Sequence, residues 1–282
     1  RFVGMNEGGK TSEALEVMRN FLKMNGARGL YIKAEGRLSP EMQVRSGVNF
    51  TTDEDSWEDG NCFVFESNIY ETVLDLMRAL VGDNKSNTKY CFILDSLDGL
   101  IMKDDLKKGF EDAHKVAGGA LLGAKFMQKM SIALAKRGHM AIFISQVRAD
   151  IKLDPYSKAP LRLTSATGGT ALLHFADSML DFEGRYKKDM ILENPTQPID
   201  SNKNKILGHN AKMTVKKSPT EKTNYVLEYP IKYGRTGGNS IWVERELTDM
   251  LYGRENIQKR GAWITVDESF LELLKEKDFN FP

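Results

Sequence analysis

The sequence is poor in the features that mark disulfide-bonded and membrane-spanning proteins. Only two of its 282 residues are cysteines, Cys62 and Cys91. Two thiols inside or beside apolar runs do not make a disulfide framework, and we expect both to be buried and reduced, as in a cytoplasmic setting. No apolar run approaches the roughly 20 residues that span a bilayer, so we expect neither a membrane-spanning nor a secreted chain.

An excess of charge of one sign is also lacking, because 40 basic side chains balance 39 acidic ones. This balance excludes a basic field over the whole surface, so any contact with nucleic acid must come from a local patch. The four histidines share no short spacing, and we expect no histidine metal site. What remains is an ordinary globular composition, with length enough for one large domain or a core with a small appendage.

The chain begins at Arg1 and not at a methionine. Its first motif starts at Gly4, so only three residues stand where a complete strand normally precedes such a motif. We therefore expect a fragment that has lost an N-terminal segment.

Strand-like and helix-like patterns alternate over the first two-thirds of the chain. A short strand-like run predicts a strand over residues 30–34, and apolar runs predict buried strands over 90–94 and 140–145. Apolar residues at helical spacing predict helices over residues 12–24, 69–80 and 121–135. This alternation predicts an α/β fold with a mostly parallel central sheet flanked by helices. Sheets of this kind bind ligands at the carboxyl ends of their strands.

The rest of the chain is less regular. We expect loops over residues 149–167 and 194–210, a hairpin formed by 213–215 and 225–233, and a short helix near 269–277. We divide the chain into an ATPase-type core, residues 1–233, and a small C-terminal α+β cap, residues 234–282. Trp242 and Trp263 are expected to lie in the core of the cap.

Residues 4–11 read GMNEGGKT and fit the phosphate-loop pattern G-x-x-x-x-G-K-[ST]. Glycines let successive backbone N–H groups turn towards a phosphate, and the following helix adds its positive end. Lys10 is expected to reach the β and γ phosphates, and Thr11 to offer its hydroxyl to Mg²⁺. A chance match is the alternative, but strand residues precede the motif and an amphipathic helix follows it. The nucleotide-binding residues expected here are Gly4, Glu7, Gly8, Gly9, Lys10, Thr11 and Ser12.

Three polar residues follow predicted strands. Asp95 comes after the buried run 90–94 and could orient Mg²⁺, although capping a helix is an alternative role. Glu35 ends the strand 30–34, where a carboxylate could polarise an attacking water. Gln146 follows the strand 140–145, where an amide could sense the γ-phosphate or serve only a structural role.

These motifs, together with four further segments, occur in the order found in the RecA family of homologous-recombination ATPases, and the sequence resembles a phage-like, UvsX-type version of that family. YIKAEG, at residues 31–36, resembles the strand that carries the family's catalytic glutamate, here Glu35. The further matches are YCFILDSLDGL at 90–100, FISQVR at 143–148, TGGTALLHFADSMLDF at 167–182 and the segment from YGRTGGNS to IQKRGAWI at 233–264. They resemble, in that order, the Walker B strand, the two signatures that flank the second DNA-binding loop, and the start of the C-terminal region.

The resemblance implies a RecA-like fold and a DNA-dependent ATPase that uses ATP and Mg²⁺. It implies filaments on single-stranded DNA, pairing and strand exchange with duplex DNA, copies of the same chain as partners, no membrane, and a cytoplasmic location, in the host if the chain is phage-encoded. Gln146 falls on the γ-phosphate sensor, and Lys216 on one of two lysines that reach a neighbouring subunit's ATP. The first DNA-binding loop should lie around residues 109–120. The implied DNA contacts are Arg148, Gly168, Gly169 and Lys125.

The sequence departs from the family pattern at several of these positions. Ser145 replaces the asparagine before the sensor, and Ser218 replaces the second of the two lysines. Met42 stands where a residue normally stacks on adenine, and Ser39 replaces a nearby acidic residue. The first DNA loop is rich in glycine and alanine, so its usual bulky wedge is expected to be missing.

The loop at 149–167 supports DNA binding on its own composition only in part. Basic and apolar side chains in it could contact phosphates and bases, and those we assign to DNA are Lys152, Tyr156 and Arg162. A mobile surface loop is the alternative, and the adjacent glycines Gly168 and Gly169 favour a phosphate contact. Residues 201–220 hold five lysines and no acidic residue, which indicates either a solvated face or a cluster of phosphate contacts.

We predict an ATPase that drives DNA strand exchange, with Glu35 activating water and with Lys10 and Mg²⁺ holding charge in the transition state. Gln146 would couple the state of the phosphates to the DNA loops. Two other functions stay open. One is a ring helicase with the same fold; the other is a recombination accessory protein that binds ATP and hydrolyses little of it.

Overall fold

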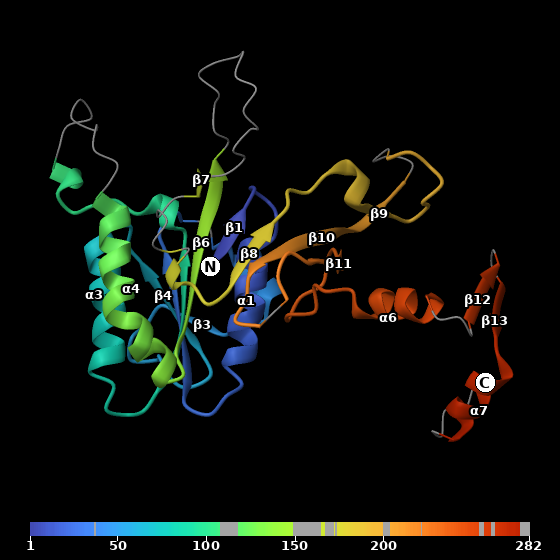
Figure 1. The fold of residues 1–282 in the computed structure, drawn as a ribbon, viewed down its shortest axis with the longest axis horizontal. Helices are drawn as coiled ribbons and strands as arrows, with labels where there is room; N and C mark the ends of the chain where they lie inside the picture. Colours follow the sequence, from blue (N-terminus) through green and yellow to red (C-terminus); the bar gives the residue numbers. More distant parts are fainter. Residues whose placement is uncertain are drawn as a thin grey trace, which may run out of the picture.

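The computed structural model describes residues 1–36, 38–107, 118–148, 165–166, 172, 174–199, 204–220, 222–253, 257–260 and 263–276. Its centre is a large mixed sheet whose strands follow the order β11-β10-β8-β1-β6-β5-β2-β4-β3 (Figure 1). The pairs from β3 to β8 along this order are parallel, whereas β10 and β11 run antiparallel. The predicted mostly parallel α/β fold is confirmed.

The strands of the main sheet are short to medium in length. They are β1 (Phe2–Gly4), β2 (Ala27–Lys33), β3 (Phe50–Thr51), β4 (Cys62–Glu66), β5 (Lys89–Asp95), β6 (Met140–Arg148), β7 (Ser165–Ala166), β8 (Met179–Phe182), β9 (Met190–Leu192), β10 (Ile206–Lys217) and β11 (Val226–Lys232). The helices are α1 (Lys10–Phe21), α2 (Pro40–Ser46), α3 (Tyr70–Gly82), α4 (Gly118–Lys136), α6 (Val243–Tyr252) and α7 (Glu268–Glu276). A separate hairpin joins β12 (Ile257–Arg260) to β13 (Trp263–Val266).

Helices cover both faces of the sheet, and β5 shows why its residues are apolar throughout. Cys91 and Ile93 belong to the cluster on the α1 face, where Leu15 and Met18 of α1 are fully buried. The alternate residues of β5, with side chains from α3 and α4, form the cluster on the other face. Because side chains alternate across a strand, a strand covered on both sides needs an unbroken apolar run.

Both cysteines are buried and free, as predicted. Cys62 on β4 and Cys91 on β5 lie opposite Gly29, on the strand between them. Burial raises the pKa of the Cys91 thiol to about 12, so it behaves as a small apolar side chain at neutral pH. None of the helices in the described part of the chain combines the length and the apolar character that crossing a bilayer requires.

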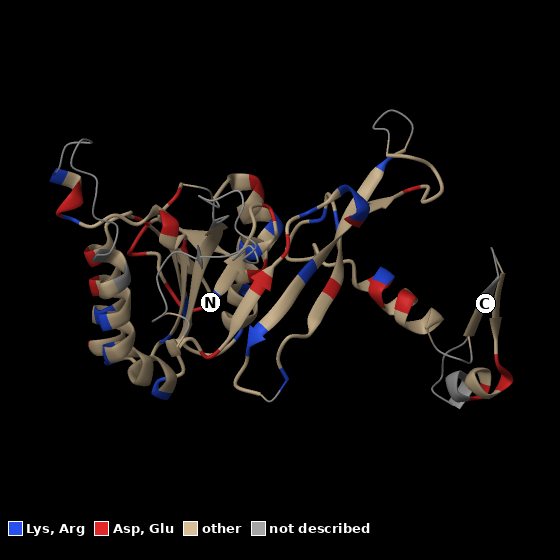
Figure 2. Ribbon diagram, turned by 45° about the horizontal axis from the view of Figure 1, so that its top comes forward, with Lys and Arg blue, Asp and Glu red and all other residues tan. Residues whose placement is uncertain are grey.

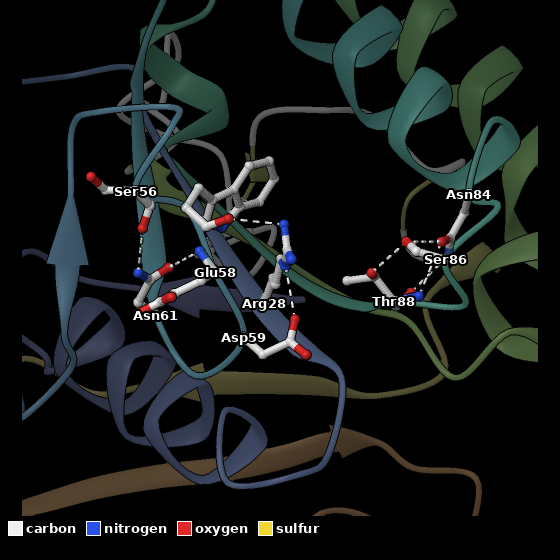
Figure 3. A network of polar contacts seen from close by, with 9 residues as sticks. Arg28, Ser56, Glu58, Asp59, Asn61, Asn84, Ser86 and Thr88 are labelled. Carbon is white, nitrogen blue, oxygen red and sulfur yellow. Dashed lines mark hydrogen bonds and ion pairs between the residues drawn. The ribbon is translucent and has the colours of Figure 1, made fainter.

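Figure 3 shows that polar side chains close the turns at the amino ends of the parallel strands. Arg28 donates to the Asp59 carboxylate and to the Trp57 carbonyl, each at 2.9 Å. Asn84 and Thr88 exchange two hydrogen bonds, at 2.7 and 3.0 Å, in the turn before β5. These bonds fix the turns between elements, and the cavity described below lies at the opposite edge of the sheet.

Several predicted boundaries are wrong. Gln146 does not follow its strand, because β6 continues to Arg148 and pairs with β7. Residues 165–166, predicted as loop, therefore form a strand, and residues 206–210 belong to β10. The polar residues in 206–210 sit in a strand because β10 is paired on both sides, so neighbouring strands satisfy its backbone groups. Residues 118–120, predicted as part of the first DNA loop, begin α4.

The elements that follow residue 234 expose more apolar surface than predicted. Trp263 is 81% exposed, so it is not a core residue, because β13 belongs to a two-stranded hairpin apart from the main sheet (Figure 1). Trp242 is partly buried, and Lys232 and Arg245 lie over its ring at 4.6 and 5.5 Å. The predicted hairpin of β10 and β11 is confirmed.

The buried side chain of His139 predicts how the stability of the fold depends on pH. Its Nδ1 accepts a hydrogen bond from the Tyr90 N–H at 3.0 Å, and its ring stacks on Tyr90. Burial, with a smaller effect of Arg137, lowers the pKa of His139 below its usual value of 6.5. The folded chain therefore favours the neutral ring, and its stability is complete above the unfolded pKa and falls as the pH drops towards the folded pKa.

We expect His139→Asn, whose amide oxygen can replace Nδ1 as the acceptor, to flatten this dependence. Urea unfolding at about pH 7 and at about pH 5 measures the free energy of unfolding of each protein. Between these two pH values the wild-type chain should lose more stability than the variant. An equal loss in both proteins would show that folding does not shift the pKa of His139.

Candidate active site

A cavity of about 510 Å³ lies at the carboxyl ends of the parallel strands. Ligand pockets in proteins usually hold between about 300 and 1,000 Å³. Residues 6–13 form one wall, and residues at the ends of β2, β5 and β6 form its floor. Side chains of β10 and β11 and of the segment that follows them form the opposite wall. The cavity therefore lies between the ends of the parallel strands and the antiparallel pair β10 and β11.

The phosphate-loop glycines are required by close packing as well as by turn geometry. A Cβ at Gly4 would lie 2.2 Å from the Phe182 carbonyl oxygen, and one at Gly8 would lie 2.6 Å from that of Glu183. Gly9, at the N-cap of α1, has a φ of 94°, a conformation that glycine adopts at little cost. The loop thus lies directly against the end of β8, where the Met5 N–H donates to the Phe182 carbonyl at 3.2 Å.

Lys10 and Thr11 lie where the loop becomes helix. Lys10 is 8% exposed, and its Nζ donates to the Gly4 carbonyl at 3.0 Å and to the Met5 carbonyl at 2.6 Å. The Thr11 hydroxyl donates to Asp95 Oδ2 at 2.7 Å. A cation, a hydroxyl and a carboxylate therefore meet at the N-terminus of one helix, which is where a phosphate and its metal ion are usually bound.

Tyr31, which the sequence analysis missed, also contacts Asp95. Its phenolic hydroxyl donates to Asp95 Oδ2 at 2.6 Å. Burial, followed by the charge of Asp95, raises the pKa of Tyr31 far above its usual value, so the hydroxyl stays protonated and remains a donor. Asp95 is the last residue of β5 and does not cap the next turn, because Ser96 is the N-cap there.

Glu35 and Gln146 meet beside Asp95. Gln146 Nε2 donates to Glu35 Oε2 at 3.3 Å, and the Ser96 hydroxyl donates to Glu35 Oε1. The backbone N–H of Gln146 donates to Asp98 Oδ2 at 2.7 Å. A Cβ at Gly99 would lie 2.7 Å from Glu35 Cγ, so glycine at 99 makes room for this carboxylate.

The opposite wall contains residues that the sequence analysis did not assign to the site, among them Arg185, His209, Tyr229 and Tyr233. Met42, which it did assign, lines the cavity and packs against the α1-side core. Burial raises the pKa of Tyr229, whose hydroxyl donates to Glu13 Oε2 at 3.3 Å. No spacing in the sequence relates these wall residues to the phosphate loop.

The remaining predicted residues are divided between the cavity and the surface. Glu7 and Ser12 line the cavity, whereas Lys125 on α4 and Lys216 on β10 are exposed and are not among the lining residues. Burial raises the pKa of Asp181, and Lys216 and Lys10 partly offset that shift. The charged residues are distributed unevenly over the neighbouring strands (Figure 2): β8 has one acidic residue, β10 has three lysines and no acidic residue, and β11 has one glutamate and one lysine.

Of the DNA contacts predicted in and around the second loop, Arg148 lies within the described residues. Arg148 is the last residue of β6 and its backbone pairs with Ser165. Five other predicted contacts lie outside the described residues, namely Lys152, Tyr156, Arg162, Gly168 and Gly169.

The donor set fits a magnesium ion that a nucleotide brings with it. Thr11 and Asp95 provide one hydroxyl and one carboxylate, both oxygen ligands. Among the described residues no group of three or more His, Cys, Asp or Glu side chains is placed to hold a metal ion. Magnesium is commonly held by one or two protein oxygens together with substrate phosphates and water, which is the arrangement these two residues allow.

Comparison with known proteins agrees with the order of the motifs. The family model described as "RecA N-terminal domain" matches residues 1–234. The curated "Protein RecA" of Frankia alni is 29% identical over 278 residues, which cover 99% of this chain and 70% of that protein. That of Mycobacterium ulcerans is 28% identical with the same coverage, and that of Bifidobacterium breve is 28% identical over 97% of this chain and 61% of its own length. The family model spans most of the 282 residues, and the chain therefore belongs to the RecA family.

Proposed function

We propose that this chain hydrolyses ATP in the cavity and uses the hydrolysis to act in homologous recombination. It would form filaments on single-stranded DNA and exchange that strand with duplex DNA. One observation carries the proposal: four residues from the carboxyl-terminal side of four different strands line one cavity in a chain of the RecA family, namely Lys10, Glu35, Asp95 and Gln146.

In this proposal the triphosphate lies along residues 4–11. Gly8 and Gly9 allow the backbone N–H groups to face the phosphates, and the positive end of α1 favours their charge. Lys10 neutralises charge on the β and γ phosphates as the bond to the leaving group lengthens. The base would lie towards the wall that contains Met42 and Tyr233.

Glu35 is the proposed general base. Its carboxylate accepts the proton of the attacking water, and the donors Ser96 and Gln146 hold its two oxygens in place. Removing either donor would leave the carboxylate free to turn away from the water. Gln146 also stands between Glu35 and the end of β6, so a change at the γ-phosphate can reach the chain that follows Arg148.

Thr11 and Asp95 are the proposed magnesium ligands. A bound Mg²⁺ supplies charge neutralisation and orientation of the phosphate oxygens. Tyr31 fixes the Asp95 carboxylate through a hydrogen bond of 2.6 Å, which holds the ligand in position before the nucleotide binds.

The DNA contacts remain proposals at the level of the family. Arg148, the residues of the second loop named above and Lys125 are proposed to contact the DNA backbone. Lys216 is exposed, which is compatible with a role at a neighbouring subunit's nucleotide and not at the chain's own. We also propose a division of the chain into a core, residues 1–233, and a cap, residues 234–282. A cytoplasmic location is proposed as well, and the two free, buried thiols suit it.

A recombination accessory protein of low ATPase activity is the second candidate, favoured by residues at the end of β10 and at the start of α2. Lys217 Nζ donates to the His174 carbonyl at 2.8 Å, and Ser218 bonds to Thr220. Where the family has the second of its two lysines, this chain thus has Ser218, whose hydroxyl bonds to the nearby Thr220. Ser39 likewise caps α2 by accepting from the Met42 N–H, so the base pocket lacks an acidic group at that position.

ATP hydrolysis with and without single-stranded DNA, followed by electron microscopy, separates these functions. A recombinase should show DNA-stimulated hydrolysis and helical filaments. We expect Arg148→Ala to weaken single-strand binding several-fold and to lower its salt dependence by about one phosphate contact, with DNA-free hydrolysis mostly intact. Arg78→Ala, which removes an arginine 62% exposed on α3, is the control.

Unchanged DNA affinity in Arg148→Ala would refute the assignment of the second DNA loop. Rings that unwind duplex DNA without pairing would support the helicase. ATP binding with little turnover, with or without DNA, would support the accessory function.

A further inference from the structure

Arg185 bridges the two walls of the cavity. It lies three residues beyond the end of β8, and its guanidinium forks between two partners. One Nη donates to Glu7 Oε2 at 2.9 Å, and the other donates to the Tyr233 hydroxyl at 3.1 Å. Glu7 belongs to the phosphate loop, whereas Tyr233 follows β11. A single side chain therefore connects the loop to the aromatic wall opposite.

Glu7 is held in an unusual backbone conformation. Its φ is 60°, in the left-handed region that costs a non-glycine residue free energy and persists where the surroundings hold it. Its side chain, which is 73% exposed, lies on a loop shaped to hold phosphates, and its negative charge would repel them if it were uncompensated. The ion pair with Arg185 compensates this charge and restrains the loop.

Tyr233 is positioned from its other side by β10. Its backbone N–H donates to the Leu207 carbonyl at 2.9 Å, and its ring packs on His209 with the centroids 5.6 Å apart. The hydroxyl is the part of the side chain that Arg185 reaches. The ring and its backbone are therefore fixed by β10, and the bond to Arg185 joins this wall to the phosphate loop.

We propose that Arg185 is a positioning residue that keeps the two walls together around a bound nucleotide and so slows its release. The inference rests on the proposed function, because it takes a nucleoside triphosphate as the ligand of the cavity. A ligand that contacts the loop with its phosphates and the wall with its base leaves when the walls separate. The guanidinium opposes separation because its planar fork presents a separate nitrogen to each partner, whereas a lysine at this position would have to reach both partners from one nitrogen.

The test is the release of a fluorescent N-methylanthraniloyl-ATP from the full chain, chased with excess ATP and followed by stopped flow. We expect Arg185→Ala, Glu7→Gln and Tyr233→Phe each to speed release about threefold to tenfold. Tyr233→Phe keeps the ring and removes the hydroxyl, which accepts from Arg185 and also donates to Met190 Sδ at 4.0 Å. Arg185→Lys should fall between the wild type and Arg185→Ala.

Two comparisons separate a bridge from a local effect on folding. The double variant Glu7→Gln with Arg185→Ala should release nucleotide no faster than Arg185→Ala alone, because both remove the same connection. Arg28→Ala is the matched control, since Arg28 is also 33% exposed, forms a 2.9 Å ion pair and bonds to a second partner, but at the opposite edge of the sheet (Figure 3). Its release rate should equal that of the wild type.

Wild-type release in Arg185→Ala, or effects of Glu7→Gln and Arg185→Ala that multiply in the double variant, would overturn the inference while leaving the proposed function intact. Failure of the wild-type chain to bind the nucleotide would overturn both. If Arg185→Ala does not fold, wild-type release in Glu7→Gln and Tyr233→Phe overturns the inference, and faster release in both supports it.

Discussion

Lys10→Ala should leave the chain without measurable ATP turnover. The Lys10 ammonium is buried at the start of α1 and already lies against the loop carbonyls of Gly4 and Met5. It is thus held at the place where phosphates would bind, and no reorganisation is needed to bring the charge there. Loss of one such group from a phosphoryl-transfer site typically costs about 10²–10³-fold or more in kcat. Phosphate release from Mg-ATP measures the effect.

Lys23→Ala is the matched control for this substitution. Lys23 lies just beyond the other end of α1, where its Nζ donates to Asn20 at 2.8 Å on the surface. The Lys23→Ala substitution removes the same positive charge from a site outside the cavity, so ATP turnover should stay at the wild-type level. Circular dichroism of both variants separates lost chemistry from lost folding. Retained turnover in a folded Lys10→Ala chain would refute the position of the nucleotide site.

Glu35→Gln should nearly abolish hydrolysis while leaving the KM for ATP close to that of the wild type. Glutamine has the same shape and still accepts one hydrogen bond from Ser96 or Gln146, but it cannot take a proton from water. Removing a general base typically lowers kcat about 10²–10⁴-fold, and a change confined to kcat indicates an interaction made in the transition state. Steady-state kinetics with saturating Mg²⁺ provides both constants.

Glu66→Gln is the control for Glu35→Gln. Glu66 ends β4, the neighbour of β2, and its carboxylate pairs with Lys33 at 2.7 Å outside the cavity. It is a glutamate at the same edge of the sheet with no role in the proposed reaction. Wild-type kcat in Glu35→Gln would show that another group activates the water, and an equal loss in Glu66→Gln would indicate a general effect on the sheet.

The elements of the core were predictable because their signals are local. The run YCFIL in β5 has five apolar residues in succession, and such a run predicts a strand covered on both faces wherever it occurs. The same holds for the helix after the phosphate loop, whose apolar residues repeat at helical spacing. Two of the errors, at residues 206–210 and at Gln146, fell where pairing with distant strands decided the outcome.

Part of the site was predictable for a topological reason. Asp95, Glu35 and Gln146 were expected near the ends of three strands, and the carboxyl ends of parallel strands lie at one edge of a sheet. Predicting parallel strands was therefore enough to bring the three residues towards one place. Their hydrogen bonds to Tyr31, Ser96 and Asp98 were not predicted, because they depend on register and rotamer.

The amino-acid sequence alone thus determined the phosphate loop, the apolar strands and the family. The loop and the strands depend on residues a few positions apart, and the family is indicated by the order of the motifs along the chain. The far wall of the cavity required the folded chain. Arg185 and Glu7 are 178 positions apart, and they meet because β8 pairs with β1 and because two glycines let the loop lie against its end. Contacts of that kind leave no periodic trace along the chain, since strand order and close packing bring the partners together.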